Sequence, residues 1–136
     1  MTYTPETWPI GAALLNFAGV TQDGLDRTEA GPHAWKQTLR EVSVAGFDHV
    51  DLTDSWVRAG DLDAAGRSQL LELARSYGLS FSDLAVTRKS VITADEDQAQ
   101  RNMAYTKRTI DAAADLEAPM VCLGLHDPLT QEQKDA

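Results

Sequence analysis

The sequence predicts an α/β fold in which strands and helices alternate along the chain. Short apolar runs are separated by longer segments whose apolar residues recur with helical spacing, and glycines stand where those helices should stop. The predicted order is βαβαβαβ, with a further helix beginning near the end of the sequence. This alternation is typical of parallel strands joined by right-handed crossovers.

Residues 9–52 contain the first strand, the first helix and the second strand. The apolar run from Pro9 to Phe17 is consistent with a buried strand. The segment HAWKQTLREVSVAG predicts a helix that stops at Gly46, because its apolar residues repeat at i, i+4 and i+7. Those residues are Trp35, Leu39 and Val42. The segment FDHVDL, residues 47–52, then predicts the second strand.

The remaining elements follow the same logic. Residues 61–78 predict a helix that stops at Gly78, and LSFSDLAV, residues 79–86, predicts the third strand. The longest helix should run from about Ala94 to Leu116, with a T-x-x-E capping box at its start. Its predicted inner face is Ala99, Met103, Thr106, Ile110 and Ala113. The segment PMVCLGL predicts the fourth strand, and HDPLTQEQKDA predicts the opening of a fourth helix.

Composition and charge narrow the candidate functions. The formal net charge is −9, and such a surface repels phosphate backbones and anionic lipids, so nucleic acids and membranes are poor candidate partners. The single cysteine, Cys122, excludes an intrachain disulfide, suits a cytoplasmic protein and is interpreted as a core-filling residue. The N-terminal segment has no basic region before its short apolar run, so neither a signal peptide nor a membrane span is predicted.

Two architectures share this pattern of elements. A doubly wound open sheet would be complete with four or five strands, whereas a (β/α)8 barrel would be half complete. A dinucleotide-binding sheet needs G-x-G-x-x-G after its first strand, but the region here is NFAGVTQDG, and no Walker A motif occurs. The pattern alone leaves both architectures open.

Three segments together resemble the xylose-isomerase-like family of sugar phosphate isomerase/epimerase barrels. GFDHVDL resembles the second-strand motif, ARSYGLSFSDLAV the passage into strand three, and RNMAYTKRTIDAAADLEAPMVCL the third helix and fourth strand. The resemblance covers nearly the whole chain. It implies a (β/α)8 TIM barrel of which residues 1–136 supply roughly the first four βα units, the N-terminal half of a single domain.

A narrower resemblance concerns one subgroup. Strand four leads into GLHDP where the family often has a Gly-Ser or Gly-Gly turn. The LGLHDP segment and the insertion TQDGLDRTEAGPHAW are similar to the large subunit of C-glycoside deglycosidases. That resemblance implies a substrate sugar already oxidised at C3 and a small β-rich partner subunit.

A half-barrel should not stand alone. Four strands would leave two parallel edges and an uncovered inner face. We therefore expect the remaining barrel half to exist, either as a continuation of the polypeptide or as a partner chain. The competing expectation is a half-barrel that dimerises to close itself.

Barrel enzymes carry their active sites at the C-terminal ends of the strands. Strand alternation puts Cys122, Gly124 and His126 toward the barrel axis. His126 is the candidate catalytic residue, because an imidazole at the barrel mouth can act as a general base or bind a sugar hydroxyl. The alternative is a turn histidine that caps the next helix or packs against Pro128.

The candidate substrate contacts are Asn16, Phe17, Asp51, Asp54, Trp56 and Thr87. Asp51 faces the axis and could hold a sugar hydroxyl, or it could form a salt bridge inside the barrel. Trp56 could stack on a sugar ring, or it could anchor its loop in the core. His49 lies one layer deeper than Asp51 and is interpreted as a core histidine with satisfied hydrogen bonds.

The resemblance also implies a chemistry. A divalent metal (Mn, Mg, Co or Zn) assists proton abstraction next to a carbonyl, with isomerisation, epimerisation or elimination of a C-linked aglycone as the outcome. The family's metal ligands lie on strands five to eight, so no residue of this chain is assigned as a ligand. The alternative is a non-catalytic α/β binding or scaffold module, which an open-sheet strand order would indicate. A DNA-repair endonuclease of the family is disfavoured by the charge of −9.

Overall fold

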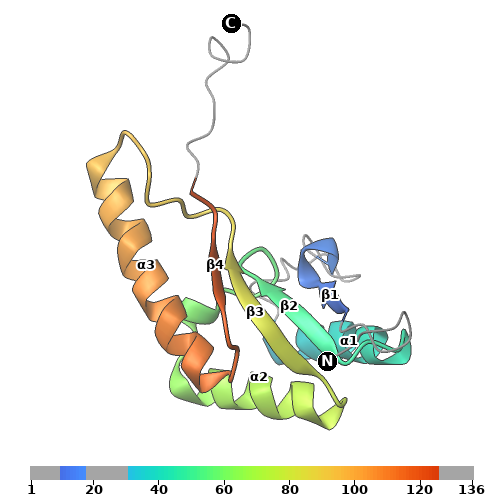
Figure 1. Cartoon of the computed structure of the whole chain (residues 1–136). Coiled ribbons are helices and arrows are strands. Elements are labelled where there is room, and N and C mark those ends of the chain that lie inside the picture. Colours follow the sequence, from blue (N-terminus) through green and yellow to red (C-terminus); the bar gives the residue numbers. More distant parts are fainter. Residues whose placement is uncertain (1–9, 18–30, 126–136) are drawn as a thin grey trace, which may run out of the picture.

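The computed structural model describes residues 10–17 and 31–125. They form a parallel sheet with the strand order β1-β2-β3-β4 (Figure 1). The strands are Gly11–Ala13 (β1), His49–Thr53 (β2), Ser80–Val86 (β3) and Val121–Leu123 (β4). Neighbours in the sheet are neighbours in the sequence, with no reversal of direction. This order is that of half a barrel and differs from the switched order of a doubly wound sheet.

Helices cover one face of this sheet. They are α1 (Gly31–Val44), α2 (Ala64–Ser76) and α3 (Glu96–Asp115), with two short 3-10 helices, η1 (Leu14–Phe17) and η2 (Ala59–Asp61). The core joins Val50, Leu52 and Leu84 of the sheet to all three α-helices. The helices contribute Trp35, Leu39, Val42, Leu70, Ala74, Ala112 and Ala113, and the C-cap of α3 contributes Leu116. The inner face predicted for the first helix, Trp35, Leu39 and Val42, is therefore confirmed. The second helix buries Leu70 and Ala74 and ends at its C-cap, Tyr77.

The glycine stop signals are confirmed as well. Gly46 and Gly78 have φ angles of +90° and +71°, which L side chains rarely adopt. The first strand is shorter than predicted, since the chain leaves the sheet after Ala13 and turns into η1. This turn places Leu14 in the core with no exposed surface and leaves Leu15 and Asn16 exposed.

The start of α3 differs from the predicted capping box. Asp95 is the N-cap, and its carboxylate accepts a hydrogen bond from the Gln98 backbone N at 3.0 Å. Thr93 Oγ1 instead accepts from the Asp95 backbone N at 3.4 Å. An aspartate is among the strongest N-caps, and its negative charge also suits the helix N-terminus, so the helix begins two residues later than predicted.

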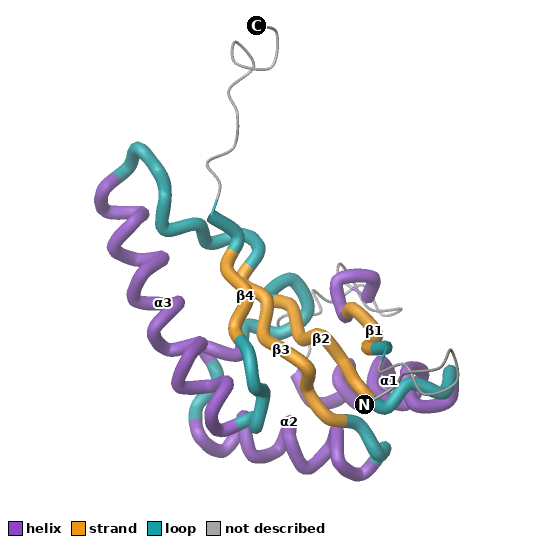
Figure 2. Tube along the Cα trace, viewed as in Figure 1, coloured by secondary structure: helices purple, strands orange, loops and turns teal. Residues whose placement is uncertain are grey.

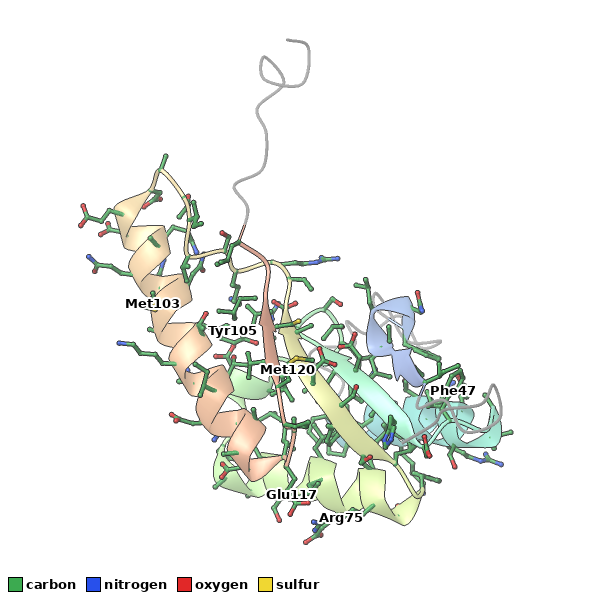
Figure 3. The ribbon with its side chains drawn as sticks, viewed as in Figure 1. Phe47, Arg75, Met103, Tyr105, Glu117 and Met120 are labelled. Carbon is green, nitrogen blue, oxygen red and sulfur yellow. The ribbon has the colours of Figure 1, made fainter. Side chains whose placement is uncertain are left out.

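The inner face of α3 also differs from the prediction. Thr106 and Ala113 are buried as predicted, but Met103 and Ile110 are 44% and 52% exposed. Tyr105, Thr109 and Ala112 are also buried. The reason is η2, which the sequence pattern did not reveal and which packs along α3. Figure 3 shows Tyr105 on the side of α3 that faces the sheet. The apolar residues of α3 therefore lie on two sides of the helix.

The edge strand β4 is only partly covered. Val121 packs against the core, but Leu123 and Leu125 are 41% and 58% exposed. Cys122 is exposed, which corrects its interpretation as a core-filling residue. The reason is its position on the sheet face opposite the helices, because Cys122 pairs with Ala85 while Val121 pairs with core Leu84. Within the described residues, no helix is long and apolar enough to cross a membrane.

Candidate functional site

Parallel strands bring their C-terminal ends to one edge of the sheet. Figure 2 shows the loops that leave β2 and β3 at this edge. The sequence-predicted candidates Asp54 and Trp56 follow β2, Thr87 follows β3, and Asn16 and Phe17 lie in η1 after β1. The structure therefore assembles candidates from three strands on one edge. His126, the predicted catalytic residue, lies outside the described residues.

Asp54 and Thr87 are bound to each other. Asp54 Oδ1 accepts hydrogen bonds from Thr87 Oγ1 at 2.7 Å and from the Thr87 backbone N at 3.2 Å. Asp54 Oδ2 accepts from the Arg88 backbone N at 3.3 Å. Asp54 is only 8% exposed. These contacts hold the loop after β2 against the loop after β3, which fixes the shape of this edge.

Trp56 is part of the core. Its side chain has no exposed surface, and its Nε1 donates to Thr38 Oγ1 of α1 at 3.3 Å. A ring stacked on a sugar needs a free face, so this burial removes Trp56 from the candidate substrate contacts and favours its role as a loop anchor. Phe17 is half-buried and packs against the same core, whereas Asn16 is exposed.

The sheet face opposite the helices carries a pair of carboxylates. Asp51 of β2 stands directly opposite Asp83 of β3 in the ladder. A regular ladder continuing from Val50 and Phe81 would put Ser82 opposite Asp51, but the register shifts between Val50 and Asp51. This bulge places the two carboxylates in neighbouring positions.

The environment of this pair favours protonation. Burial, then the charge of Asp83, then a side-chain hydrogen bond with Asp83 raise the pKa of Asp51 from 3.8 to about 6. Asp51 Oδ1 is buried and finds no hydrogen-bond donor among the described residues. Asp83 is 8% exposed, and its Oδ1 lies 3.2 Å from Ser82 Oγ. Two adjacent carboxylates with so few hydrogen-bond donors repel each other when both are charged, so the doubly charged state is unfavourable.

Asp83 was absent from the sequence-predicted candidates. Strand alternation relative to Leu84 and Ala85 could have placed it on the inner face. Its position opposite Asp51 could not be found in that way, because it depends on the bulge. His49, also on this face, is more exposed than a core histidine, and its Nδ1 hydrogen-bonds Ser80 Oγ at 2.7 Å.

The described residues do not form a metal site. Over 10–17 and 31–125, no group of three or more His, Cys, Asp or Glu side chains is arranged to hold a metal ion. The Asp51–Asp83 pair offers only two such residues. Both oxygens of Asp54 already accept hydrogen bonds from Thr87 and Arg88. The residues present therefore do not fit a divalent metal by themselves.

Comparisons with solved structures give clear matches, while protein-family models and curated proteins give none. The chain is 33% identical to a xylose isomerase-like TIM barrel protein from Mycobacterium smegmatis, solved in complex with magnesium, with a TM-score of 0.79. The match covers 99% of this chain and 44% of the other, so this chain spans less than half of that protein's length.

Two more distant matches share the fold. A D-psicose 3-epimerase solved in the presence of D-fructose is 15% identical, with a TM-score of 0.54 over 73% of this chain and 37% of that chain. A 3-keto-D-glucoside 4-epimerase from E. coli is 14% identical, with a TM-score of 0.56 over 83% of this chain and 36% of that chain. In each match, the described sheet corresponds to part of a longer protein.

Proposed function

Because this chain belongs to the xylose isomerase-like TIM-barrel family, we propose that it supplies the first half of a sugar isomerase or epimerase. The observation that carries this proposal is the match over 99% of the chain at 33% identity to a barrel of more than twice its length. The unswitched strand order supports the same proposal and disfavours the open-sheet scaffold. The remaining half is a continuation of the polypeptide or a partner chain.

The proposed reaction is proton abstraction next to a sugar carbonyl. A base takes the proton from the carbon beside the carbonyl, and its electron pair moves toward the carbonyl oxygen. Return of a proton to the opposite face of the same carbon gives an epimer. Its return to the former carbonyl carbon, with transfer of the neighbouring hydroxyl proton to the former carbonyl oxygen, gives an isomer. We assign the acid/base role to His126, at the end of the fourth strand segment. The divalent ion of the family is bound by residues outside this chain.

The pocket wall is the contribution of this half. Asn16 and Phe17 after β1, Asp54 and Thr87 after β2 and β3, and Asp51 within β2 provide the candidate substrate contacts. The Asp54–Thr87 hydrogen bond presents the hydroxyl and backbone of Thr87 in a fixed position. Fixed polar groups at a barrel mouth orient a substrate without an entropic cost at the moment of reaction.

A narrower form of the proposal is C-glycoside deglycosidation. In that reaction the electron pair left by the abstracted proton expels the C-linked aglycone of a 3-oxo-glycoside. The carbon–carbon bond to the aglycone breaks, a carbon–carbon double bond forms in the sugar, and the aglycone carbon takes up a proton. With this form we also propose a small β-rich partner subunit and a cytoplasmic location. The segment LGLHDP supports this form by its resemblance alone.

Solvent deuterium exchange tests the proposal. The purified protein is incubated in D2O with ketoses and 3-oxo-glycosides, and NMR follows deuterium at the carbon beside the carbonyl. We expect exchange, and we expect His126→Gln to slow it by about 10²-fold or more. Asp111→Asn, on the exposed side of α3, is the control and should leave the rate unchanged. Aglycone release in the same samples distinguishes the narrower form.

Two outcomes would contradict this proposal, the first in full and the second in the role of His126. A protein whose mass corresponds to a complete barrel but which exchanges no deuterium with any sugar of these classes is not this enzyme. Exchange that is equally fast in the His126→Gln variant would remove His126 from the acid/base role, while the isomerase proposal would stand.

A further inference from the structure

The inner face of the sheet carries a charged pair that the proposed reaction does not use as acid or base. Asp51 and Asp83 stand opposite each other across the β2–β3 ladder, at the bulge formed by Ser82. Neither carboxylate forms an ion pair with a basic side chain of the described residues. Two like charges on adjacent strands are destabilising unless something separates or neutralises them.

The hydrogen-bond donors around the pair are too few. Asp51 Oδ1 is buried and has no donor within the described part of the chain. Ser82 Oγ lies 3.0 Å from the Val50 carbonyl and 3.2 Å from Asp83 Oδ1, and its single hydrogen serves one of them at a time. A proton between the two carboxyl groups would supply the missing donor, because a protonated carboxyl can donate to a carboxylate.

We propose that Asp51 and Asp83 hold one proton between them, as a carboxylic acid–carboxylate pair on the inner face of the barrel. The pair then carries a single negative charge, and its short hydrogen bond ties β2 to β3 beside the bulge. Such a pair binds and releases its proton as one unit, so the proton belongs to the pair and not to either aspartate.

The other groups near the pair do not replace the proton. The β1 strand, which pairs Ala13 with Asp51, contains no titratable side chain. On β2 itself, the nearest titratable residue of the same face is His49, which is hydrogen-bonded to Ser80. Asp48 lies next to His49, with a separation of 3.8 Å between His49 Nε2 and its Oδ1. On β4 the inner face carries Cys122, which pairs with Ala85, two residues along β3 from Asp83.

Barrel completion would strengthen this proton site. Covering the inner face removes water from both carboxyl groups, which disfavours the doubly charged form further. Association with the remaining half should therefore take up a proton. This consequence rests on the half-barrel of the proposed function, whereas the shared proton of the pair does not.

The sign of the pH effect follows from the direction of the pKa shift. The pKa of Asp51 is raised above its unfolded value of 3.8, so its contribution to stability is present at low pH and lost as the pH rises through about 6. An asparagine at either position donates its amide hydrogens to the remaining carboxylate and does not titrate. Either substitution should thus help the folded state at high pH.

Thermal unfolding of the purified protein at several pH values tests this. The measured quantity is the unfolding temperature of Asp51→Asn minus that of wild type. We expect this difference to be larger at about pH 8 than at about pH 5, by about 4 °C or more. Asp83→Asn provides the second variant and should show the same trend. Asp111→Asn removes an exposed charge and serves as the control, with a difference that stays flat. A flat difference for both Asp51→Asn and Asp83→Asn would overturn the proposal.

Infrared spectroscopy gives a readout that needs neither variant to fold well. The wild-type protein should show the carbonyl stretch of a protonated carboxylic acid that disappears as the pH rises through about 6. No such band near this pH would overturn the proposal. Because this band is independent of turnover, failure of the deuterium-exchange assay would leave the shared proton standing.

Discussion

The hydroxyl of Thr87 donates a hydrogen bond of 2.7 Å to Asp54 Oδ1, although the two residues follow different strands. The same oxygen accepts from the Thr87 backbone N, and Asp54 Oδ2 accepts from the Arg88 backbone N. One buried carboxylate thus organises two loops at the C-terminal ends of the strands, where TIM-barrel enzymes in general carry their active sites.

Removal of this carboxylate should be costly. We expect Asp54→Ala to lower the free energy of unfolding by about 1–3 kcal/mol, because it leaves the Thr87 and Arg88 donors without their acceptor. Thr87→Val removes one donor and keeps the backbone contacts, so its cost should be about 1 kcal/mol. Urea denaturation of the two variants measures both values. Equal costs would show that the backbone hydrogen bonds contribute little.

A tight contact between η2 and α3 gives a second prediction. A Cβ at Gly60 would lie 2.6 Å from Thr109 Oγ1 and 3.1 Å from the Thr109 backbone N. Arg108 Nε also donates to the Gly60 carbonyl at 3.0 Å, so η2 cannot shift freely. Gly60→Ala should destabilise the protein by about 1–3 kcal/mol. Adding Thr109→Ala should recover part of this loss, and a purely additive double variant would contradict the clash.

The element order and the helix-facing sheet residues were predictable from the sequence, because both depend on local spacing. Val50, Leu52, Leu84 and Val86 are buried as strand alternation required. The inner face of α3 was not predictable in the same way. Its burial pattern depends on η2, a short turn without periodic signal, which packs against Tyr105 and Thr109.

In the candidate site, too, some features were predictable from local spacing and others depended on tertiary contacts. The edge of the sheet and the inward position of Asp51 followed from parallel strands and alternation. Which residue pairs with Asp51 across the ladder depended on a register shift, because a one-residue shift changes every pairing beyond it. The spacing of apolar residues in the sequence does not reveal such a shift. The burial of Trp56 depended on the neighbouring α1, where Thr38 Oγ1 accepts a hydrogen bond from Trp56 Nε1.

The end of α3 gives a third prediction. Glu117 has a φ of +57°, a left-handed conformation in which glycine is favoured, and its Oε2 accepts from Arg75 Nη2 at 2.6 Å. Figure 3 shows Glu117 and Arg75 side by side. The ion pair is largely exposed and contributes about 1 kcal/mol at most.

Relief of the backbone strain should therefore be visible once the ion pair is absent. In an Arg75→Ala background, Glu117→Gly should raise the free energy of unfolding by about 0.5–1 kcal/mol. Denaturant titration of the single and double variants provides the comparison. A loss of stability on Glu117→Gly in that background would show that the left-handed conformation carries no strain.

The exposed apolar side of α3 gives a fourth prediction, which concerns the remaining barrel half. Met103 and Ile110 lie on this side, and Leu123 lies on the neighbouring edge strand. If the next βα unit covers them, Ile110→Lys should destabilise the complete protein by about 2 kcal/mol or more, through loss of apolar burial and burial of a charge. Lys107→Glu, at another exposed position of α3, is the control with an expected change within about 0.5 kcal/mol.

Thermal or chemical unfolding of the complete protein measures this effect. An Ile110→Lys variant as stable as wild type would mean that this side of α3 remains in water. The remaining half would then have to close the barrel without contacting α3.

Native mass spectrometry tests most directly whether this chain is half of a closed barrel. The 136 residues have a mass of 14.8 kDa. Half of a closed barrel should have a native mass well above 14.8 kDa, either in one polypeptide or in a complex with a second chain. A folded, monodisperse monomer of 14.8 kDa would contradict it, because the edges of β1 and β4 would then be stable without partners.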